Sequence, residues 1–326
     1  MAARTVALGP GGEFDLIRRF LAHPEALSPD VLVGPGDDAA VLQGGWVVSA
    51  DLSVEDVHFR RGWLEDDEVG FRAAAAALSD LAAMAATPVG VLVSMAFPRG
   101  GRWDPERVQE GVRQAAGLAG AAVLGGDVSR SPGPLVLDVT VLGRAPSPVL
   151  RAGAVPGDEV WVTGALGASA AAVRIWEGGG EPGAPLRGAF ARPVARTGAA
   201  TALARNGVLH AMVDVSDGLA GDAGHLAAAG GVALVLEVAS IPVAHAAAVA
   251  LGEDQARDGA LHGGEDYELC FAAPPGAVTP SVAEDVGIPL TRVGRVEAGE
   301  GVWLEDATGA RSRPTRGGYD HAGGGG

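Results

Sequence analysis

The chain has 326 residues and contains no lysine, so that all 24 residues counted as Lys or Arg are arginine. Forty Asp and Glu residues give a formal net charge of −16 at pH 7. The lack of lysine excludes a Walker-type phosphate loop, a protein-kinase site and Schiff-base or pyridoxal chemistry, because each of these needs a lysine amine. The excess of acid argues against a nucleic-acid or anionic-membrane surface, since both require a basic patch.

The rest of the composition is typical of a soluble globular protein. Hydrophobic residues make up 48% of the chain, and the length predicts two domains, because single cores rarely grow beyond about 250–300 residues. Cys270 is the only cysteine, which excludes an intrachain disulfide and a cysteine-ligated zinc site. No apolar run approaches the roughly 18 residues of a membrane span, and the N-terminus lacks a clear signal-peptide pattern. We therefore expect a cytoplasmic enzyme without a membrane partner.

Strands and helices are predicted to follow one another through the first half of the chain. We expect an amphipathic helix over 13–21 and a long alanine-rich helix over about 68–86, which ends before Pro88 because the residue before a proline disfavours helical angles. A third helix is expected to open at Asp104-Pro105. The predicted strands cover 39–42, 46–50, 89–97, 121–124 and 135–142, and the strand over 121–124 is expected to be buried.

The segment 144–156 is rich in proline, glycine and alanine, which is typical of a connection between domains. We therefore divide the chain into residues 1–145 and 146–326. In the second half the pattern predicts strands over 159–163, 211–215, 232–238 and 269–272, and helices over 169–176, 194–204 and 219–229. The predicted fold class is α/β (α+β), in two domains.

Aspartate residues gather beside glycine, at the predicted ends of strands and in turns. A single Asp-Gly pair is most often a turn, because Asp accepts backbone hydrogen bonds and Gly supplies positive φ. Several such sites together are different, since strands that end in Asp can direct several carboxylates into one crevice. The clusters are Gly36-Asp37-Asp38, Ser49-Ala50-Asp51, Gly125-Gly126-Asp127 and Asp214-Val215-Ser216-Asp217-Gly218, together with Asp80 inside the long helix.

Carboxylates that converge in this way repel one another unless cations neutralise them. Oxygen ligands alone favour Mg²⁺, which takes a few carboxylates and completes its octahedron with water and substrate phosphate. Bound Mg²⁺ would also attract a nucleotide polyphosphate to a chain of negative charge and neutralise a transferred phosphoryl group. The residues alone therefore predict a metal-dependent enzyme that acts on phosphates.

Nine motifs, in order along nearly the whole chain, carry a resemblance to thiamine-monophosphate kinase. They are GEFDLI (12–17), GPGDDAAVL (34–42), SADLSVEDVHF (49–59), LSDLAAMAATP (78–88), GGDVSR (125–130), LRAGAVPGD (150–158), DVSDGL (214–219), GGEDYEL (263–269) and GYDH (318–321). That family belongs to the superfamily of aminoimidazole ribonucleotide (AIR) synthetase and selenophosphate synthetase. The resemblance implies phosphorylation of thiamine monophosphate to thiamine diphosphate by ATP with Mg²⁺. It also implies a homodimer in which strands of the N-terminal α/β domain form a barrel across the dimer, followed by a C-terminal α/β domain.

Carried over motif by motif, the resemblance implies three groups of site residues. The metal ligands would be Asp38, Ser49, Ala50 through its backbone carbonyl, Asp51, Asp80, Asp127, Asp214 and Asp217. The ATP contacts would be Gly126, Asp127, Arg151 and Ser216. The thiamine contacts would be His58, Glu265 and Tyr319. Asp51, Asp127 and Asp217 would act at the reacting phosphates, where in-line attack by an ionised phosphate monoester needs no strong general base.

Several of these residues also have a simpler, purely structural interpretation. His58 lies in a predicted strand, where a structural histidine is the alternative, and Asp80 would be unremarkable on a solvent-exposed helix face. The chain also departs from the family pattern at three positions. Ala50 stands where threonine is common, Asp56 replaces a usual glycine, and Ala322 replaces a usual phenylalanine after the GYDH motif.

Other members of the superfamily fit the sequence less well. Selenophosphate synthetase normally has a cysteine or selenocysteine and a lysine near its N-terminus, and a hydrogenase-maturation relative normally ends in a cysteine-bearing tail. AIR synthetase shares the acidic clusters but matches the motifs over 78–88 and 263–269 less closely. A catalytically silent protein that binds a nucleotide or thiamine phosphate is the alternative from another class.

Overall fold

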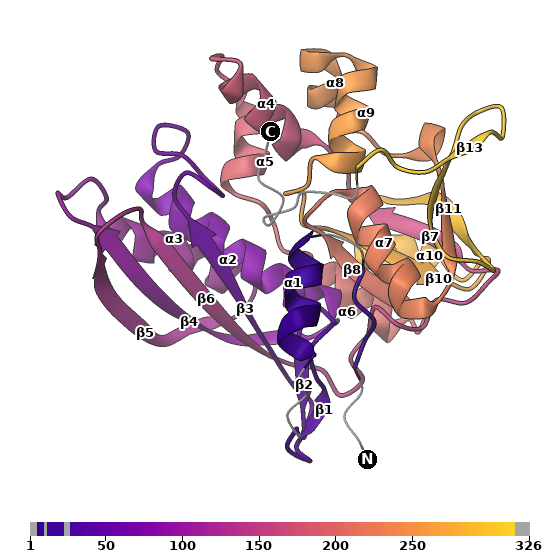
Figure 1. The fold of residues 1–326 in the computed structure, drawn as a ribbon, viewed down its shortest axis with the longest axis horizontal. Helices are drawn as coiled ribbons and strands as arrows, with labels where there is room; N and C mark the ends of the chain where they lie inside the picture. The colour runs from indigo at the N-terminus through magenta and orange to yellow at the C-terminus, as the bar shows by residue number, and fades with distance from the viewer. Residues whose placement is uncertain (1–4, 10–11, 23–26, 317–326) are drawn as a thin grey trace.

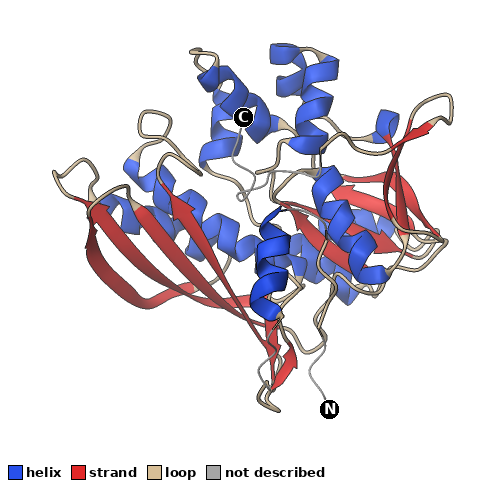
Figure 2. Cartoon of the chain, in the orientation of Figure 1, coloured by secondary structure: helices blue, strands red, loops and turns tan. Residues whose placement is uncertain are grey.

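The computed structural model describes residues 5–9, 12–22 and 27–316, which form two β-sheets with helices packed against them (Figure 1, Figure 2). The first sheet has the strand order β1-β2-β3-β6-β4-β5, and its neighbouring strands are antiparallel except for the parallel pair β4 and β5. Its strands are β1 (Val31–Val33), β2 (Ala40–Leu42), β3 (Trp46–Val54), β4 (Thr87–Pro98), β5 (Ala122–Ser131) and β6 (Val136–Arg144). A short helix, α1 (Gly12–Leu21), precedes them.

Two helices cover one face of this sheet, α2 (Asp66–Ala83) and α3 (Pro105–Leu118). Asp104 caps α3, since its carboxylate accepts the backbone N–H groups of Glu106 at 3.0 Å and Arg107 at 3.3 Å. Glycine lets α2 and α3 approach closely: a Cβ at Gly70 would lie 1.9 Å from the Val108 carbonyl oxygen. The alanine-rich sequence of α2 therefore serves close packing on both α3 and the sheet.

The second sheet has seven strands in the order β13-β12-β9-β11-β7-β10-β8. Its neighbouring strands are antiparallel except for the parallel pair β9 and β12. Its strands are β7 (Glu159–Thr163), β8 (Ala211–Val215), β9 (Ala233–Glu237), β10 (Glu268–Ala273), β11 (Leu290–Glu297), β12 (Gly301–Glu305) and β13 (Arg311–Ser312). All residues of β8 and β10 are buried, including one carboxylate in each strand, Asp214 and Glu268.

Helices cover both faces of the second sheet. The helices of the second half are α4 (Ala168–Glu177), α5 (Ala184–Ala191), α6 (Thr197–Arg205), α7 (Leu219–Gly230), α8 (His245–Leu251), α9 (Glu253–His262) and α10 (Pro280–Val286). Of these, α4, α5, α8 and α9 pack mainly on one another. One face of the sheet packs against α7, and the other packs against α6 and α10. A 3₁₀ turn over Val238–Ser240 follows β9.

The long helix α2 joins the two halves of the chain. It packs on α3, β3 and β6 of the first half, and on α5, α6 and β8 of the second. Phe71 of α2 shares one hydrophobic cluster with Trp176 of α4 and Phe190 of α5. A charged residue on α2 can therefore face the junction between the halves, which explains how such a residue is accommodated in an apolar helix.

The predicted α/β class with two domains is confirmed. The helix over 68–86 and the strands over 159–163 and 211–215 are present, whereas α5, α8 to α10 and β11 to β13 were not predicted. The expectation that the strand over 121–124 is buried is wrong, because β5 is an exposed strand at the end of its sheet. Asp51 and Asp127 lie within strands rather than at strand ends.

The division at residues 145 and 146 falls between β6 and β7, and we retain it as a proposal. Neither sheet closes into a barrel within the described part of one chain, so the barrel across a dimer stays a prediction. None of the helices found among the described residues has both the length and the apolar character needed to cross a bilayer.

Candidate active site

Three carboxylates from distant parts of the sequence meet where the two halves of the chain join. One carboxylate oxygen from each of Asp38, Asp80 and Asp214 lies within 4.8 Å of the other two. Asp80 comes from α2 and Asp214 from β8, while Asp38 follows a turn at Gly36. Gly36 has a φ of +120°, and a Cβ there would lie 2.2 Å from the Val6 carbonyl oxygen, so the turn that presents Asp38 requires glycine.

Burial and mutual repulsion raise the pKa values of this cluster. Burial, followed by the charges of Asp214, Asp51 and Asp38, raises the pKa of Asp80 well above its ordinary value. Burial and the charge of Asp38 raise the pKa of Asp214 to about 7. Because ionised carboxylates this close repel one another, a cation between them would be strongly favoured. Their all-oxygen donor set suits a hard divalent ion such as Mg²⁺.

A serine and an arginine hold the cluster in place. The Ser49 hydroxyl oxygen lies 2.6 Å from Asp80 Oδ2 and 3.1 Å from the Asp38 carbonyl oxygen. Two nitrogens of the Arg151 guanidinium donate hydrogen bonds to the Asp38 carboxylate, at 2.7 and 3.1 Å. The Arg151 backbone N–H donates to the Asp37 carboxylate at 3.2 Å. Arg151 therefore fixes Asp38 in this structure, and its predicted contact with nucleotide phosphate stays a prediction.

Asp80 and Asp214 of the cluster line one cavity, which adjoins a second. The first, of about 200 Å³, is lined by Ala50, Asp51, Ser53, His58, Arg72, Ala76, Asp80, Asp214, Ser216, Asp217, Glu265 and Tyr267. The second, of about 210 Å³, shares four of these residues and adds the aromatic side chains Trp63 and Phe190. The shared residues are His58, Ser216, Asp217 and Glu265. The two cavities thus meet at residues predicted to contact ATP, metal and thiamine.

His58 has a structural role as well as a place in both cavities. The backbone N–H of Val54 donates to His58 Nδ1 at 3.0 Å, so a neutral imidazole carries its proton on Nε2. The Asp56 residue that replaces a usual glycine has a φ of +68°, and its N–H donates to the Phe59 carbonyl at 2.7 Å. This turn sets the direction in which the His58 ring enters the site.

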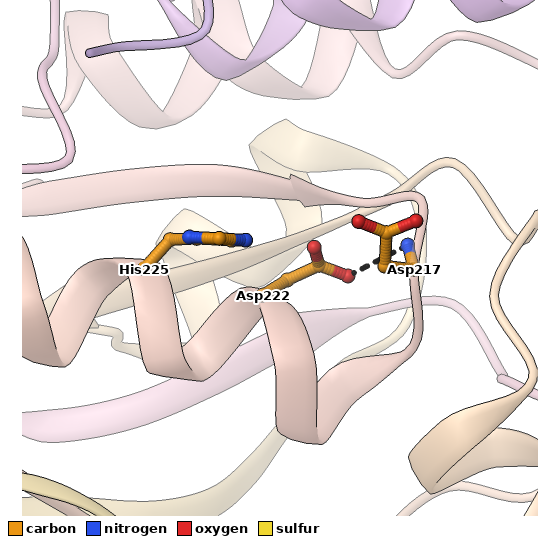
Figure 3. Close-up of side chains that lie close together, drawn as sticks. All are labelled: Asp217, Asp222 and His225. Atoms are coloured by element: carbon orange, nitrogen blue, oxygen red, sulfur yellow. Dashed lines mark hydrogen bonds between the residues drawn. The ribbon is translucent and has the colours of Figure 1, made fainter. Parts of the chain in front are cut away.

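The turn that carries Asp217 is tied to α7. The Asp217 backbone N–H donates to Asp222 Oδ2 at 3.1 Å, and Figure 3 shows Asp222 and His225 on α7 pointing along the helix toward Asp217. Ligand atoms of these three residues lie within 4.8 Å of one another. Burial lowers the pKa of His225 to about 3, so the imidazole is neutral near pH 7. Asp222 was not predicted, although it lies in the same sequence segment as the Asp214–Asp217 motif.

Gly126 and Asp127 do not join the cluster within one chain. They lie on β5, and two strands, β6 and β4, separate β5 from Asp51 on β3. Three strand spacings correspond to about 14 Å across the sheet. Gly126 has a φ of +151°, and a Cβ there would meet the Val93 carbonyl oxygen at 1.7 Å, so packing alone requires glycine. Tyr319, the remaining predicted thiamine contact, lies outside the described residues.

Several further residues that line the cavities were not predicted, among them Trp63, Arg72, Phe190 and Tyr267. The sequence did indicate Arg72, because a charged residue in an alanine-rich helix is unfavourable unless it is exposed or has a compensating partner, as for Asp80. Phe190 lies on α5, which was not predicted because the residues before it are rich in glycine and proline and indicate a loop.

Comparisons with known proteins agree with this architecture. Residues 36–145 match the family model described as AIR synthase related protein, N-terminal domain, and residues 155–306 match its C-terminal domain counterpart. The thiamine-monophosphate kinase of Rhodopirellula baltica is 36% identical over 308 residues, covering 90% of this chain and 92% of that protein. The chain belongs to the thiamine-monophosphate kinase family.

Solved structures extend the likeness to three dimensions. The crystal structure of thiamine-monophosphate kinase from Stenotrophomonas maltophilia K279a is 36% identical with a TM-score of 0.74, covering 92% of this chain and 97% of that chain. A structure described as AaThiL complexed with AMPPCP and TMP is 29% identical with a TM-score of 0.80, covering 96% of this chain and 97% of that chain.

Proposed function

We propose that this chain transfers the γ-phosphoryl group of ATP to the phosphate of thiamine monophosphate, giving thiamine diphosphate and ADP. The observation that carries the proposal is the cluster of Asp38, Asp80 and Asp214 beside two joined cavities, at the junction of the two halves. The relative complexed with AMPPCP and TMP supports both substrates. AMPPCP is a non-hydrolysable analogue of ATP, and TMP in a thiamine-monophosphate kinase is thiamine monophosphate.

The residues of the site suit phosphoryl transfer without a lysine at the phosphates. The carboxylates that would hold Mg²⁺ are Asp38, Asp51, Asp80, Asp214 and Asp217. Mg²⁺ would neutralise charge on the transferring phosphoryl group. Ser49 and Arg151 keep Asp80 and Asp38 in fixed positions, which preserves the geometry of the donor set. The acceptor is a phosphate monoester with a second pKa near 6, so it is largely ionised near pH 7 and needs no general base. Catalysis then depends on positioning and electrostatics.

We infer that the working form is a homodimer in the cytoplasm, in which β5 faces a second copy. Leu124 and Val128 of β5 are 55% and 71% exposed, and Leu92 on the neighbouring β4 is also exposed. Such a strand at the end of an open sheet is a favourable surface for pairing. A partner at this surface would explain why Gly126 and Asp127 lie far from the cluster of their own chain: we propose that they complete the site of the other copy.

Product analysis tests the proposed reaction. Purified protein is incubated with ATP, thiamine monophosphate and Mg²⁺, and ³¹P NMR follows the phosphate signals. We expect thiamine diphosphate and ADP to form in equal amounts, and EDTA to stop both. Nucleotide binding without either product would favour a silent binding protein, and ADP without thiamine diphosphate would indicate a different acceptor.

A further inference from the structure

Arg72 is a buried cation beside the carboxylate cluster, and it connects three parts of the site. Its residue is 3% exposed, on α2, two turns before Asp80. One guanidinium nitrogen donates to the Phe190 carbonyl at 2.7 Å, and another forms an ion pair with Glu265 Oε2. The guanidinium carbon lies 3.8 Å from the centre of the Phe190 ring. Arg72 therefore joins the aromatic wall of the second cavity to the carboxylate that both cavities share.

The segment that carries Glu265 has a strained and well-anchored backbone. Glu265 and Tyr267 have φ values of +65° and +51°, which are unfavourable for residues with a side chain. Their backbone N–H groups donate to the carbonyls of Ser216 and Val215 at 2.7 and 2.8 Å. The strained conformation is thus fixed against the segment that contains Asp214 and Asp217.

Two donors hold the same oxygen of the Glu265 carboxylate. The Tyr267 hydroxyl donates to Oε2 at 2.8 Å, and Arg72 contacts Oε2 as well. Among the described residues, both side-chain contacts of this carboxylate are therefore made to Oε2. Because Glu265 lines both cavities, Oε1, which contacts no side chain among the described residues, can accept a hydrogen bond from a ligand there.

We propose that Arg72 and Tyr267 are positioning residues that fix Glu265 so that Oε1 accepts a hydrogen bond from the exocyclic amino group of the substrate's aminopyrimidine. This inference rests on the proposed function. A fixed acceptor discriminates better than a mobile one, because a ligand without the matching donor leaves a buried polar group unpaired. The Phe190 ring, held by the same arginine, forms part of the wall against which a flat ring can lie.

The test compares thiamine monophosphate with oxythiamine monophosphate, in which a carbonyl oxygen replaces the amino group. For the wild-type protein we expect kcat/KM to be at least about 100-fold lower with the oxo analogue, because two acceptors then face each other. In Arg72→Met the ratio of kcat/KM for thiamine monophosphate to kcat/KM for the oxo analogue should fall below about 10. The cause would be a higher KM for thiamine monophosphate, while the KM for ATP stays unchanged. Tyr267→Phe removes one of the two donors and should give an intermediate ratio.

A matched control comes from the same pair of helices. Arg187 on α5 forms an ion pair with Glu68 on α2, with contacts of 2.5 and 2.6 Å, and lines neither cavity among the described residues. Arg187→Met should therefore keep the wild-type ratio of kcat/KM values for the two substrates.

If Arg72→Met fails to fold, Tyr267→Phe becomes the test of the inference, since this substitution deletes only a hydroxyl. An active wild-type protein with an unchanged ratio in the foldable variants would overturn the inference. A wild-type protein that makes no thiamine diphosphate would instead contradict the proposed function.

Discussion

Asp80 lies in the alanine-rich second half of α2, and its carboxylate is placed among other carboxylates rather than in solvent. Burial and three neighbouring aspartates raise its pKa, which means that the ionised form is costly without a cation. Ser49, at 2.6 Å, is a neutral partner and cannot balance that charge. Function and stability therefore make opposite demands on this residue.

Asp80→Asn should separate these two demands. We expect turnover to fall by more than about 100-fold at saturating Mg²⁺, because a ligand is lost. In EDTA the variant should unfold at a higher temperature than the wild-type protein, because a repelled, buried charge is removed. Thermal unfolding with EDTA and a turnover assay check both effects. Wild-type turnover together with a lower unfolding temperature would contradict the assignment.

Single residues of the site were predictable where chemistry and spacing are both unusual. Asp38, Asp80 and Asp214 belong to glycine-flanked or helix-buried acidic motifs, and the structure brings them together. Arg72 was missed because arginine in a helix is usually a surface charge, and its partner Glu265 lies far away in the sequence. Only the fold shows that the two meet.

At the scale of the element, the turn that follows β3 and precedes α2 depends on one unusual residue. Asp56 has a φ of +68° in the turn that orients His58. Asp tolerates this conformation better than most residues, but glycine adopts it without steric cost. We expect Asp56→Gly to be at least as stable as the wild-type protein, and Asp56→Ala to be less stable than Asp56→Gly by about 1 kcal/mol. Urea unfolding of the two variants provides the comparison, and equal stabilities would contradict the strain.

The start of α4 depends on a buried carboxylate in the segment after α9. Asp266 accepts the Gly167 backbone N–H at 2.8 Å, and burial raises its pKa from 3.8 to about 7. Since the folded protein retains this proton longer than the unfolded chain, the contribution of Asp266 to stability is full below about pH 4 and is lost as the pH rises through 7.

Asp266→Asn should therefore gain stability relative to the wild-type protein between pH 5.5 and pH 8. The measurement is the free energy of unfolding in urea at both pH values, with the exposed Asp254→Asn as control. A difference between variant and wild type that does not change with pH would show that Asp266 ionises normally in the folded protein.

Elements with a strong local signal were predictable, and those without one were not. The apolar strand over 211–215 and the helix over 219–229 match β8 and α7 closely. In contrast, α5 follows a glycine- and proline-rich loop, and the strand over 121–124 was expected to be buried although β5 is exposed. An apolar strand on a surface that pairs with another chain has the same composition as a buried one, so sequence alone could not separate these cases.

At the scale of the whole molecule, the site depends on how the two halves meet, which no local pattern encodes. The helix α2 provides this junction, because it packs on both sheets. The exposed strand β5 also bears on assembly, because three strand spacings, about 14 Å, separate it from β3 and Asp51 within one chain. A shared site in a dimer predicts that defects in different chains can complement each other.

Mixing two inactive variants tests this prediction. After subunit exchange, Asp127→Asn and Asp214→Asn should together recover about a quarter of wild-type activity, because half of the dimers are mixed and each mixed dimer has one intact site. The matched control is Asp80→Asn mixed with Asp214→Asn. Both of these residues lie in the cluster of a single chain, so every site stays defective. No recovery in the first mixture would show that Asp127 does not serve a partner's site.

The central claim is that carboxylate-bound Mg²⁺ supports phosphoryl transfer to thiamine monophosphate in a chain without lysine. The most direct measurement is the rate of thiamine diphosphate formation from ATP and thiamine monophosphate as Mg²⁺ is titrated, for the wild-type protein and Asp214→Asn side by side. We expect saturable, Mg²⁺-dependent formation by the wild type, and a rate lower by more than about 100-fold in the variant at every Mg²⁺ concentration. No product from the wild-type protein, or equal rates for the two proteins, would contradict the account.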